Sequence, residues 1–411
     1  MNQRVVITGI GLITPLGAGI DETWRTLKSK TSRIRVIDYL DPDEFKSRIA
    51  GTIEHFDPLD YMAPKRAKRL DRFSQLSIAS SRMAIESAAL PLVNGDDIGV
   101  NLGSALGGVS YGEEQHLRYF SGGLKAVDPM IALSVFGGAG STNVAIEFGL
   151  TGPSMGNANS CASGPNAIGE AFRMIKRGEI SVMLAGGVET PLAPMTFGAF
   201  AMIRALSTRN DDPATASRPF DTGRDGFVLG EGAAMLVLES YEHAIDRGAT
   251  PLAEILGYGA TNDAYNMIAP RPDGSQAGRS ISLAMTEAQV SPGEIDYINS
   301  HSTSTPLGDP AEALAINVAL GEAGTRIPVS GTKGYYGHPL GASGAIEAAL
   351  MPLVLERGWL PPTLNLTDPD PKANVNLIAG EGIERDVQTV ASNAFGFGGI
   401  NTCIVFRGIE A

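Results

Sequence analysis

The chain has 411 residues, of which 50 are glycine and 43% are hydrophobic, and this composition is typical of a large α/β protein rather than a disordered one. Its net charge of −13 excludes general nucleic-acid binding, which depends on many contacts from Lys and Arg to phosphate. The sequence contains no uninterrupted run of about 18 apolar residues, so no membrane helix is predicted. It has two cysteines, Cys161 and Cys403, which exclude a disulfide framework and favour a reducing, cytoplasmic location.

Short runs of β-branched and other apolar residues, separated by segments with helical periodicity, predict an α/β fold with an extensively buried sheet. The first strand lies in RVVITGIG, residues 4–11. Its glycines, Gly9 and Gly11, are expected to lead into a loop and do not form a dinucleotide-binding fingerprint, so no nucleotide cofactor is expected. Further strands are predicted at Ile98 to Leu102, Val182 to Ala185, Ala233 to Leu238, Ala253 to Gly257, Ile295 to Asn299 and Asn401 to Phe406.

Cys161 follows small residues in GNANSCASG and precedes a predicted helix with one apolar face, formed by Gly164, Ile168, Ala171, Phe172 and Ile175. The N–H groups at the start of a helix carry partial positive charge, which would lower the pKa of the Cys161 thiol and make it a better nucleophile. A buried, inert cysteine is the alternative interpretation. Cys403 lies in the apolar run TCIVF and is expected to be a core residue, so the cysteines predict no structural zinc site or other metal.

A second predicted helix begins in the same way as the first. In HPLGASGAIEAALMPLVL the apolar residues Ile346, Leu350, Leu353 and Val354 keep the helical period. The tripeptide Ala-Ser-Gly occurs at 162–164 and again at 342–344, before a buried amphipathic helix each time. We therefore predict two duplicated halves that meet near residue 250, namely residues 1–250 and residues 251–411.

Two of the five histidines lie where a ligand can approach closely. His301 ends the run IDYINSH at the C-terminal edge of a predicted strand, and His338 lies among glycines just before a helix. Cys161 with these two histidines is compatible with a thiol protease, a transferase or a coincidence. A protease needs an Asn or Asp that orients one histidine, whereas two neutral imidazoles can direct N–H donors at one developing oxyanion, which suits enolate chemistry.

Four motifs occur in this order: NSCASG, HSTSTPLGD, GTKGYYGHPLGASGAIEA and SNAFGFGGIN. They resemble the Cys-His-His motifs of the β-ketoacyl-acyl-carrier-protein synthases, most closely those of the type II elongating enzymes, and the resemblance covers essentially the whole chain. It implies the thiolase fold, in which two similar βαβαβαββ halves form a five-layer α-β-α-β-α sandwich. It also implies an acyltransferase that elongates fatty acids by decarboxylative condensation with malonyl-acyl-carrier protein, without a cofactor.

The resemblance implies roles for the residues that match the family's motifs. Cys161 would carry the acyl chain as a thioester, while His301 and His338 would stabilise the enolate that remains when the malonyl thioester loses CO2. Lys333 would organise the site electrostatically, with Glu347 as its buried acidic partner. A solvated surface lysine is the alternative for Lys333.

Phe397, in FGFGGIN, corresponds to a gating phenylalanine whose ring must move before malonyl substrate enters, and the glycines on both sides give the backbone that freedom. Its N–H and that of Cys161 would form the oxyanion hole for the thioester. A core aromatic in a turn is the alternative for Phe397. The implied pocket residues are Thr303 and Thr305 on the malonyl side, with Phe200 and Leu106 on the acyl side.

The resemblance also implies an acidic partner, the acyl carrier protein in its acyl and malonyl forms. Because the chain is itself acidic, docking would need a concentrated basic patch. The implied docking residues are Lys65, Lys68, Arg69, Lys125 and Arg204, for which a solvated helix face is the alternative. A homodimer is expected, with a heterodimer as its alternative, and neither nucleic acid nor membrane insertion is expected.

Three residues depart from the family's pattern. Ser302 replaces a glycine in HSTST, Gly331 stands where a serine precedes Thr-Lys, and Tyr336 occupies a threonine position before Gly-His. The bulky Tyr336 is expected to reshape the extender or acyl pocket, which makes a ketosynthase of a polyketide or polyene pathway the second candidate. A noncatalytic heterodimer partner and an unrelated cysteine hydrolase are the remaining alternatives, and the presence of Cys161 speaks against the former.

Overall fold

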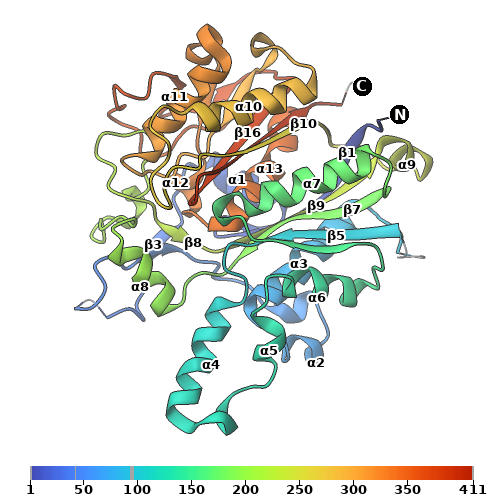
Figure 1. Ribbon diagram of the computed structural model, residues 1–411, viewed down its shortest axis with the longest axis vertical. Coiled ribbons are helices and arrows are strands. Elements are labelled where there is room, and N and C mark those ends of the chain that lie inside the picture. Colours follow the sequence, from blue (N-terminus) through green and yellow to red (C-terminus); the bar gives the residue numbers. More distant parts are fainter. Residues whose placement is uncertain (1, 42, 93–96, 410–411) are drawn as a thin grey trace.

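The computed structural model describes residues 2–41, 43–92 and 97–409 (Figure 1). The strands of its main sheet are β1 (Val5–Thr14), β2 (Gly17–Ala18), β5 (Ile98–Gly103), β6 (Ser154–Asn157), β7 (Val182–Glu189), β9 (Gly232–Ser240), β10 (Ala253–Asn262), β11 (Tyr297–Asn299), β12 (Pro328–Ser330), β14 (Asn376–Leu377), β16 (Thr389–Gly396) and β17 (Ile400–Arg407). Their order is β14-β12-β11-β16-β17-β10-β1-β9-β7-β5-β6, with β2 paired to β1. All seven predicted strands are present, and β16 is a long strand that the sequence did not predict.

Helices separate and cover the two halves of this sheet in five layers. One outer layer contains α3 (Arg72–Ser87) and α6 (Ala139–Phe148), the central layer α7 (Ser163–Lys176) and α13 (Leu340–Arg357), and the other outer layer α10 (Ser275–Ala288) and α11 (Gly308–Leu320) (Figure 1). The predicted thiolase fold is confirmed. Among the described residues, no helix is long and apolar enough to cross a membrane.

The other helices and two small sheets surround these layers. The remaining helices are α1 (Ile20–Lys28), α2 (Pro64–Ala67), α4 (Val109–Gly122), α5 (Ile131–Ser134), α8 (Pro194–Met202), α9 (Tyr241–Asp246) and α12 (Lys333–Tyr336). Two small sheets are formed by β3 (Ile34–Val36), β4 (Ile49–Gly51) and β8 (Leu229–Gly230), and by β13 (Trp359–Leu360) and β15 (Ile383–Glu384).

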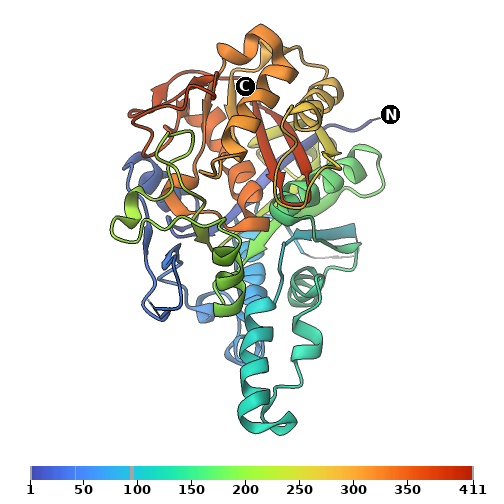
Figure 2. The same cartoon turned by 60° about the vertical axis from the view of Figure 1, so that its left-hand side comes forward.

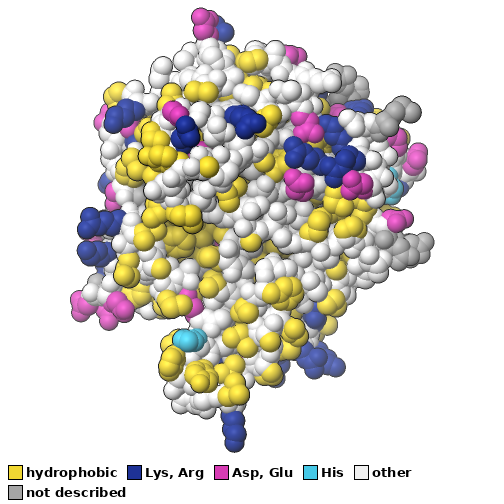
Figure 3. All heavy atoms as spheres, viewed as in Figure 1, with side chains coloured by type: hydrophobic (Ala, Val, Ile, Leu, Met, Phe, Trp, Pro, Cys, Tyr) yellow, Lys and Arg dark blue, Asp and Glu magenta, His cyan; other side chains and the backbone are white. Residues whose placement is uncertain are grey.

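An arm built from α4 and α5 projects from the body of the protein (Figures 1 and 2). Apolar side chains gather on this arm (Figure 3), and three of them, Leu117, Phe120 and Leu124, are 67%, 73% and 77% exposed. The sheet ends at β6, whose outer edge pairs with no strand among the described residues. Exposed apolar surface and an open strand edge are features that proteins commonly cover by association.

Each half contains a strand whose glycines are pressed against a helix. A Cβ atom at Gly11 of β1 would lie 1.9 Å from the carbonyl oxygen of Ser80 in α3. A Cβ atom at Gly259 of β10 would lie 1.9 Å from the carbonyl oxygen of Ser280 in α10. The same packing therefore recurs in both halves, and only glycine permits it. The expectation that Gly9 and Gly11 lead into a loop is wrong, because β1 continues through both.

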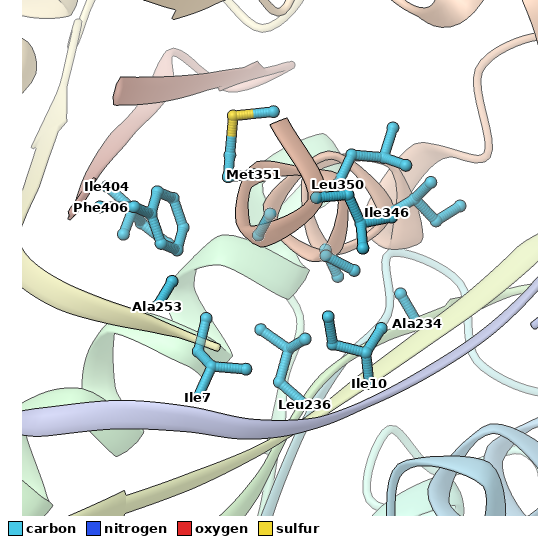
Figure 4. Close-up of a cluster of buried hydrophobic side chains, with 14 of the residues drawn as sticks. Ile7, Ile10, Ala234, Leu236, Ala253, Ile346, Leu350, Met351, Ile404 and Phe406 are labelled. Carbon is cyan, nitrogen blue, oxygen red and sulfur yellow. The ribbon is translucent and has the colours of Figure 1, made fainter. Parts of the chain in front are cut away.

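The helix α13 forms the centre of the core, where every residue from Leu340 to Leu355 is buried. Its Ile346 and Leu350 belong to one apolar cluster with Ile10 of β1 and Leu236 of β9, while Phe406 of β17 joins from the other half of the sheet (Figure 4). The helix is apolar all round because it has a sheet on both sides.

The repeated Ala-Ser-Gly tripeptides lie where α7 and α13 cross. A Cβ atom at Gly164 would lie 2.8 Å from the Cβ atom of Ala345, and one at Gly344 would lie 2.3 Å from Cγ of Pro165. The small residues therefore allow the starts of the two helices to touch, which places the residues that precede each helix close together.

We expect Gly259→Ala to lower the free energy of unfolding by about 3 kcal/mol, because the new methyl group would overlap backbone that cannot move freely. Gly293 has no atom within 4 Å of a Cβ position, so Gly293→Ala is the matched control and should change stability by less than about 0.5 kcal/mol. Urea unfolding measures both values. Equal stability of the two variants would contradict the packing described for β10.

Candidate active site

Cys161 lies in the short helical turn η4 (Ser160–Ala162), between β6 and α7. Ser160 has a φ of 52°, a conformation that non-glycine residues rarely adopt. The turn is held by Ser163, whose hydroxyl donates to the Ser160 carbonyl oxygen over 2.6 Å and accepts from the Asn159 N–H over 2.8 Å. This turn presents the thiol to a cavity of about 370 Å³.

The two histidines singled out from the sequence lie beside this thiol. His338 Nε2 is 3.1 Å from Cys161 Sγ, and its Nδ1 is 3.1 Å from the hydroxyl of Ser343 in α13. The ring of His301, which follows β11, is 5.3 Å from the His338 ring, centroid to centroid. The thiol and one nitrogen of each histidine lie within 4.8 Å of one another. The fold thus brings together all three predicted residues.

Burial controls the protonation states of these groups. Cys161 is only 6% exposed, and burial raises the pKa of its thiol to about 11. The expected lowering of this pKa is wrong, because the loss of hydration outweighs the hydrogen bonds from Ser160 and Phe397 and the charge of Lys333, which act in the opposite direction. Burial, together with the charge of Lys333, lowers the pKa of His338 and of His301 well below the usual range. At neutral pH the site therefore contains a thiol and two neutral imidazoles.

Lys333 and Glu347 form a buried ion pair behind the histidines. The Lys333 Nζ atom lies 2.6 Å from Oε1 of Glu347, and both side chains are inaccessible to solvent. Burial raises the pKa of Glu347 to about 7, although Lys333 opposes this shift. The alternative of a solvated surface lysine is wrong. Such a pair leaves a costly buried charge if either partner is removed.

Glu312, in α11, holds the backbone of His301 in place, and sequence reasoning missed it. Its Oε1 accepts from the His301 N–H and its Oε2 from the Ser302 N–H, each over 2.7 Å. Burial raises the pKa of Glu312 to about 7. The signal available was an acidic residue in the first turns of the helix that follows HSTSTPLGD, but acidic residues are common there on exposed helices too.

Phe397 covers the thiol from the loop after β16, where its N–H interacts with Cys161. A Cβ atom at Gly396 would lie 3.1 Å from the Cys161 N atom, so the two N–H groups of the expected oxyanion hole belong to adjacent backbone segments. The Phe397 ring stacks on Phe200, with centroids 6.5 Å apart. It also packs 6.4 Å from Phe227, an aromatic residue that the sequence did not single out and that lies 5.3 Å from the His338 ring.

The predicted pocket residues lie on two sides of this ring. Thr303 and Thr305 line the cavity, and their hydroxyl oxygens are 3.2 Å apart. Leu106 and Phe200 do not line it but pack with Cys161 in one apolar cluster. The ring of Phe397 belongs to that cluster as well as to the cavity wall, so it separates the open side from the apolar side.

The predicted docking residues do not form one patch. Lys65, Lys68 and Arg69 line a surface hollow together with apolar side chains from α5 and α6. Arg204 instead lines the catalytic cavity, and Lys125 lies in η3 (Leu124–Ala126), which follows α4 on the arm. Lys65, Lys68 and Arg69 form no ion pair with the described residues, so their charges are free to meet an acidic partner.

Two of the departures from the family's pattern, Ser302 and Gly331, compensate for each other in the structure. A Cβ atom at Gly331 would lie 1.9 Å from the hydroxyl oxygen of Ser302, so that hydroxyl occupies the place of a side chain at position 331. Ser302 itself has a φ of 20°, which a glycine would adopt with less strain. Tyr336 is fully buried and does not line the cavity, so it does not shape the extender side of the pocket, and its effect on the acyl side stays a prediction.

Comparisons with known proteins agree with these motifs. Residues 2–244 match the family described as "Beta-ketoacyl synthase, N-terminal domain", and residues 252–367 match its C-terminal domain. A 3-oxoacyl-[acyl-carrier-protein] synthase 2 from Staphylococcus aureus is 40% identical over 100% of this chain and 99% of its own. A β-ketoacyl synthase structure from Burkholderia phymatum has a TM-score of 0.92 and 37% identity, covering 99% of this chain and 100% of that one. A type II PKS acyl-carrier protein in complex with its ketosynthase, bound to a hexaketide, has a TM-score of 0.92 and 33% identity, with 100% of both chains covered.

We expect Gly331→Ser alone to destabilise the protein by about 2 kcal/mol, because its side chain would overlap the Ser302 hydroxyl. Combining it with Ser302→Gly should restore most of the lost stability, since the hydroxyl is then supplied from the other position. The coupling free energy from a double-mutant cycle, measured by urea unfolding, should exceed about 1 kcal/mol. Additive effects would show that the two positions do not share this space.

Proposed function

Because the chain belongs to the β-ketoacyl synthase family, we propose that Cys161 carries the acyl chain while the enzyme condenses it with malonyl-acyl-carrier protein. The enzyme is an acyltransferase of fatty-acid elongation, and its product is a 3-oxoacyl-acyl-carrier protein longer by one malonyl-derived unit. The observation that carries the assignment of roles is the 3.1 Å contact between the thiol and His338 Nε2, inside a cavity that His301 also lines.

In the first half of the reaction, Cys161 Sγ attacks the carbonyl carbon of the acyl thioester. The thiol is protonated in the closed site, and the neutral His338 is placed to accept its proton. The N–H groups of Cys161 and Phe397 stabilise the tetrahedral oxyanion. The new C–S bond to Cys161 forms as the bond to the carrier's thiolate breaks, and that thiolate leaves with the proton.

In the second half, the malonyl thioester loses CO2, and the electron pair of the broken C–C bond passes into the thioester as an enolate. His301 and His338 donate N–H hydrogen bonds to the enolate oxygen, which requires a proton on the cavity-facing nitrogen of each imidazole. Because His338 Nε2 accepts the thiol proton in the first half, His338 changes tautomer through solvent between the two halves, losing the proton on Nδ1 and gaining one on Nε2. The carbanion then attacks the acyl carbonyl on Cys161. The C–S bond breaks, its electron pair stays on Cys161 Sγ, and the thiolate takes up one proton from solvent, which balances the negative charge that the malonyl carboxylate brought to the reaction.

The gate and the docking surface follow from the same geometry. Phe397 must swing away from Phe200 before malonyl substrate reaches the thiol, and Gly398, with a φ of 82°, supplies the backbone freedom. Thr303 and Thr305 then line the malonyl side. The carrier protein docks on the hollow that contains Lys65, Lys68 and Arg69, because opposite charge and apolar contact are combined there.

Further proposals concern assembly and location. The apolar arm and the open edge of β6 support a homodimer, with a heterodimer of related subunits as the alternative. Two free, buried cysteines support a cytoplasmic location. We also propose that the halves divide near residue 250, between the two matched domains.

A polyketide pathway is the second candidate. A ketosynthase bound to a hexaketide shares the fold at a TM-score of 0.92, so the fold itself accommodates that substrate class. The greater identity to the 3-oxoacyl-[acyl-carrier-protein] synthases, 40% against 33%, favours fatty-acid elongation.

We expect Cys161→Ala to abolish both acylation and condensation, because it removes the nucleophile. His301→Ala should reduce malonyl decarboxylation by about 100-fold or more while Cys161 still becomes acylated, since His338 remains beside the thiol. Incubation with acyl and malonyl carrier-protein thioesters, followed by mass spectrometry of the Cys161 peptide and of the products, measures each step. Wild type that forms neither acyl-enzyme nor 3-oxoacyl product would refute the proposed function.

Reversal of the docking charges tests the hollow. Lys65→Glu with Lys68→Glu should raise KM for malonyl-acyl-carrier protein by about tenfold with little change in kcat, because the long-range attraction is lost. Lys46→Glu changes the charge of an exposed lysine outside the hollow and is the matched control. An equal rise in KM for control and test variants would remove the hollow as the docking site.

A further inference from the structure

Tyr336 is connected by hydrogen bonds to the buried ion pair, although it does not touch the cavity. Its hydroxyl oxygen lies 2.8 Å from Oγ1 of Thr332. Thr332 in turn donates to Oε1 of Glu347 over 3.4 Å, and the same oxygen accepts from Lys333 Nζ. A chain of hydroxyl groups therefore runs from Tyr336 to the carboxylate that pairs with Lys333, beside a direct side-chain interaction of Tyr336 with Glu347.

The direction of the hydrogen bonds follows from the chemistry of the end groups. Burial, followed by the charge of Glu347, raises the pKa of Tyr336 well above its ordinary value, so the phenol remains protonated. An ionised Glu347 can only accept hydrogen bonds, so Thr332 must direct its proton toward the carboxylate. The oxygen of Thr332 is then left to accept from Tyr336, and each bond polarises the next.

Glu347 needs this support. Its surroundings disfavour a charge, and burial raises the pKa of its carboxyl to about 7, so the ionised form is only narrowly favoured near neutral pH. Protonation of Glu347 would leave Lys333 buried without its partner. Because the charge of Lys333 acts on both histidines, any change in this pair reaches the groups that stabilise the enolate.

We propose that Tyr336 is a positioning residue that acts through Thr332 to keep Glu347 ionised. An ionised Glu347 holds Lys333 in place, and the ion pair fixes the electrostatic environment of His301 and His338. This inference rests on the proposed function, because it concerns the decarboxylation step assigned to the two histidines.

Several other ionisable groups on neighbouring elements face Glu347 or Lys333. Glu347 is faced by Tyr297 of β11 and by Lys333 and Tyr336 of α12. Lys333 acts in addition on Glu312 of α11, on His301, on His338 and on Cys161. The Tyr297 hydroxyl lies 2.8 Å from Oγ of Ser330, so its hydrogen bond is made to a different group from the one that Tyr336 contacts.

The test is Tyr336→Phe, which removes only the hydroxyl group. The ionised form of Glu347 loses support, so its pKa rises and the acidic limb of the pH profile for malonyl decarboxylation should move to higher pH by about half a unit to one unit. At pH 6.5 kcat should fall by about fivefold, with near recovery at pH 8.5. Acylation of Cys161 and KM for malonyl-acyl-carrier protein should remain unchanged.

Tyr335→Phe is the matched control, because Tyr335 is equally buried in the same helix but donates to the carbonyl oxygen of Pro362. It should leave the pH profile in place. Thr332→Val should reproduce the shift, and adding Tyr336→Phe to Thr332→Val should cause a smaller further shift than Tyr336→Phe causes alone. The proposal would be overturned by an unshifted pH profile for Tyr336→Phe, or by a pH-independent loss of activity equal to that of Tyr335→Phe. Additive shifts in the double variant would also overturn it. Wild type that fails to condense would instead refute the proposed function.

Discussion

The active site depends on the close crossing of α7 and α13, one helix from each half of the fold. Gly164 packs against the Cβ atom of Ala345 and Gly344 against the ring of Pro165, so the starts of the helices touch. Cys161 lies two residues before the start of α7 and His338 two residues before the start of α13, which is why residues 177 positions apart lie 3.1 Å from each other. A larger residue at the crossing would force the helices apart and separate the sulfur from the imidazole.

A second constraint is electrostatic. Lys333, Glu347 and Glu312 are held without solvent around a pair of neutral histidines, in a region where an unpaired charge would be costly. The protein satisfies these groups with backbone N–H donors and hydroxyl groups instead of water. Proteins commonly accept such a cost in stability at a catalytic site, where fixed charges and dipoles act on a transition state without first having to reorganise.

The sequence was sufficient for the parts of the protein that depend on local pattern. Strand and helix periodicity predicted the α/β layers, and the motifs around Cys161, His301 and His338 identified groups that the fold brings together. Contacts between distant segments were not predictable in this way. The role of Glu312, the aromatic contact of Phe227 and the shared space of Ser302 and Gly331 depend on which backbones become neighbours. The raised pKa of the thiol was missed for the same reason, because burial is a property of the assembled core.

The protonated state of the buried thiol also bears on how the enzyme withstands oxidants. Peroxides attack the thiolate, and a pKa of about 11 leaves only about one molecule in ten thousand in that form at pH 7. The protonated form and the burial of the Cys161 side chain therefore both disfavour its conversion to sulfenic acid. The same burial that makes the thiol a weak nucleophile thus also makes it a poor target for oxidants.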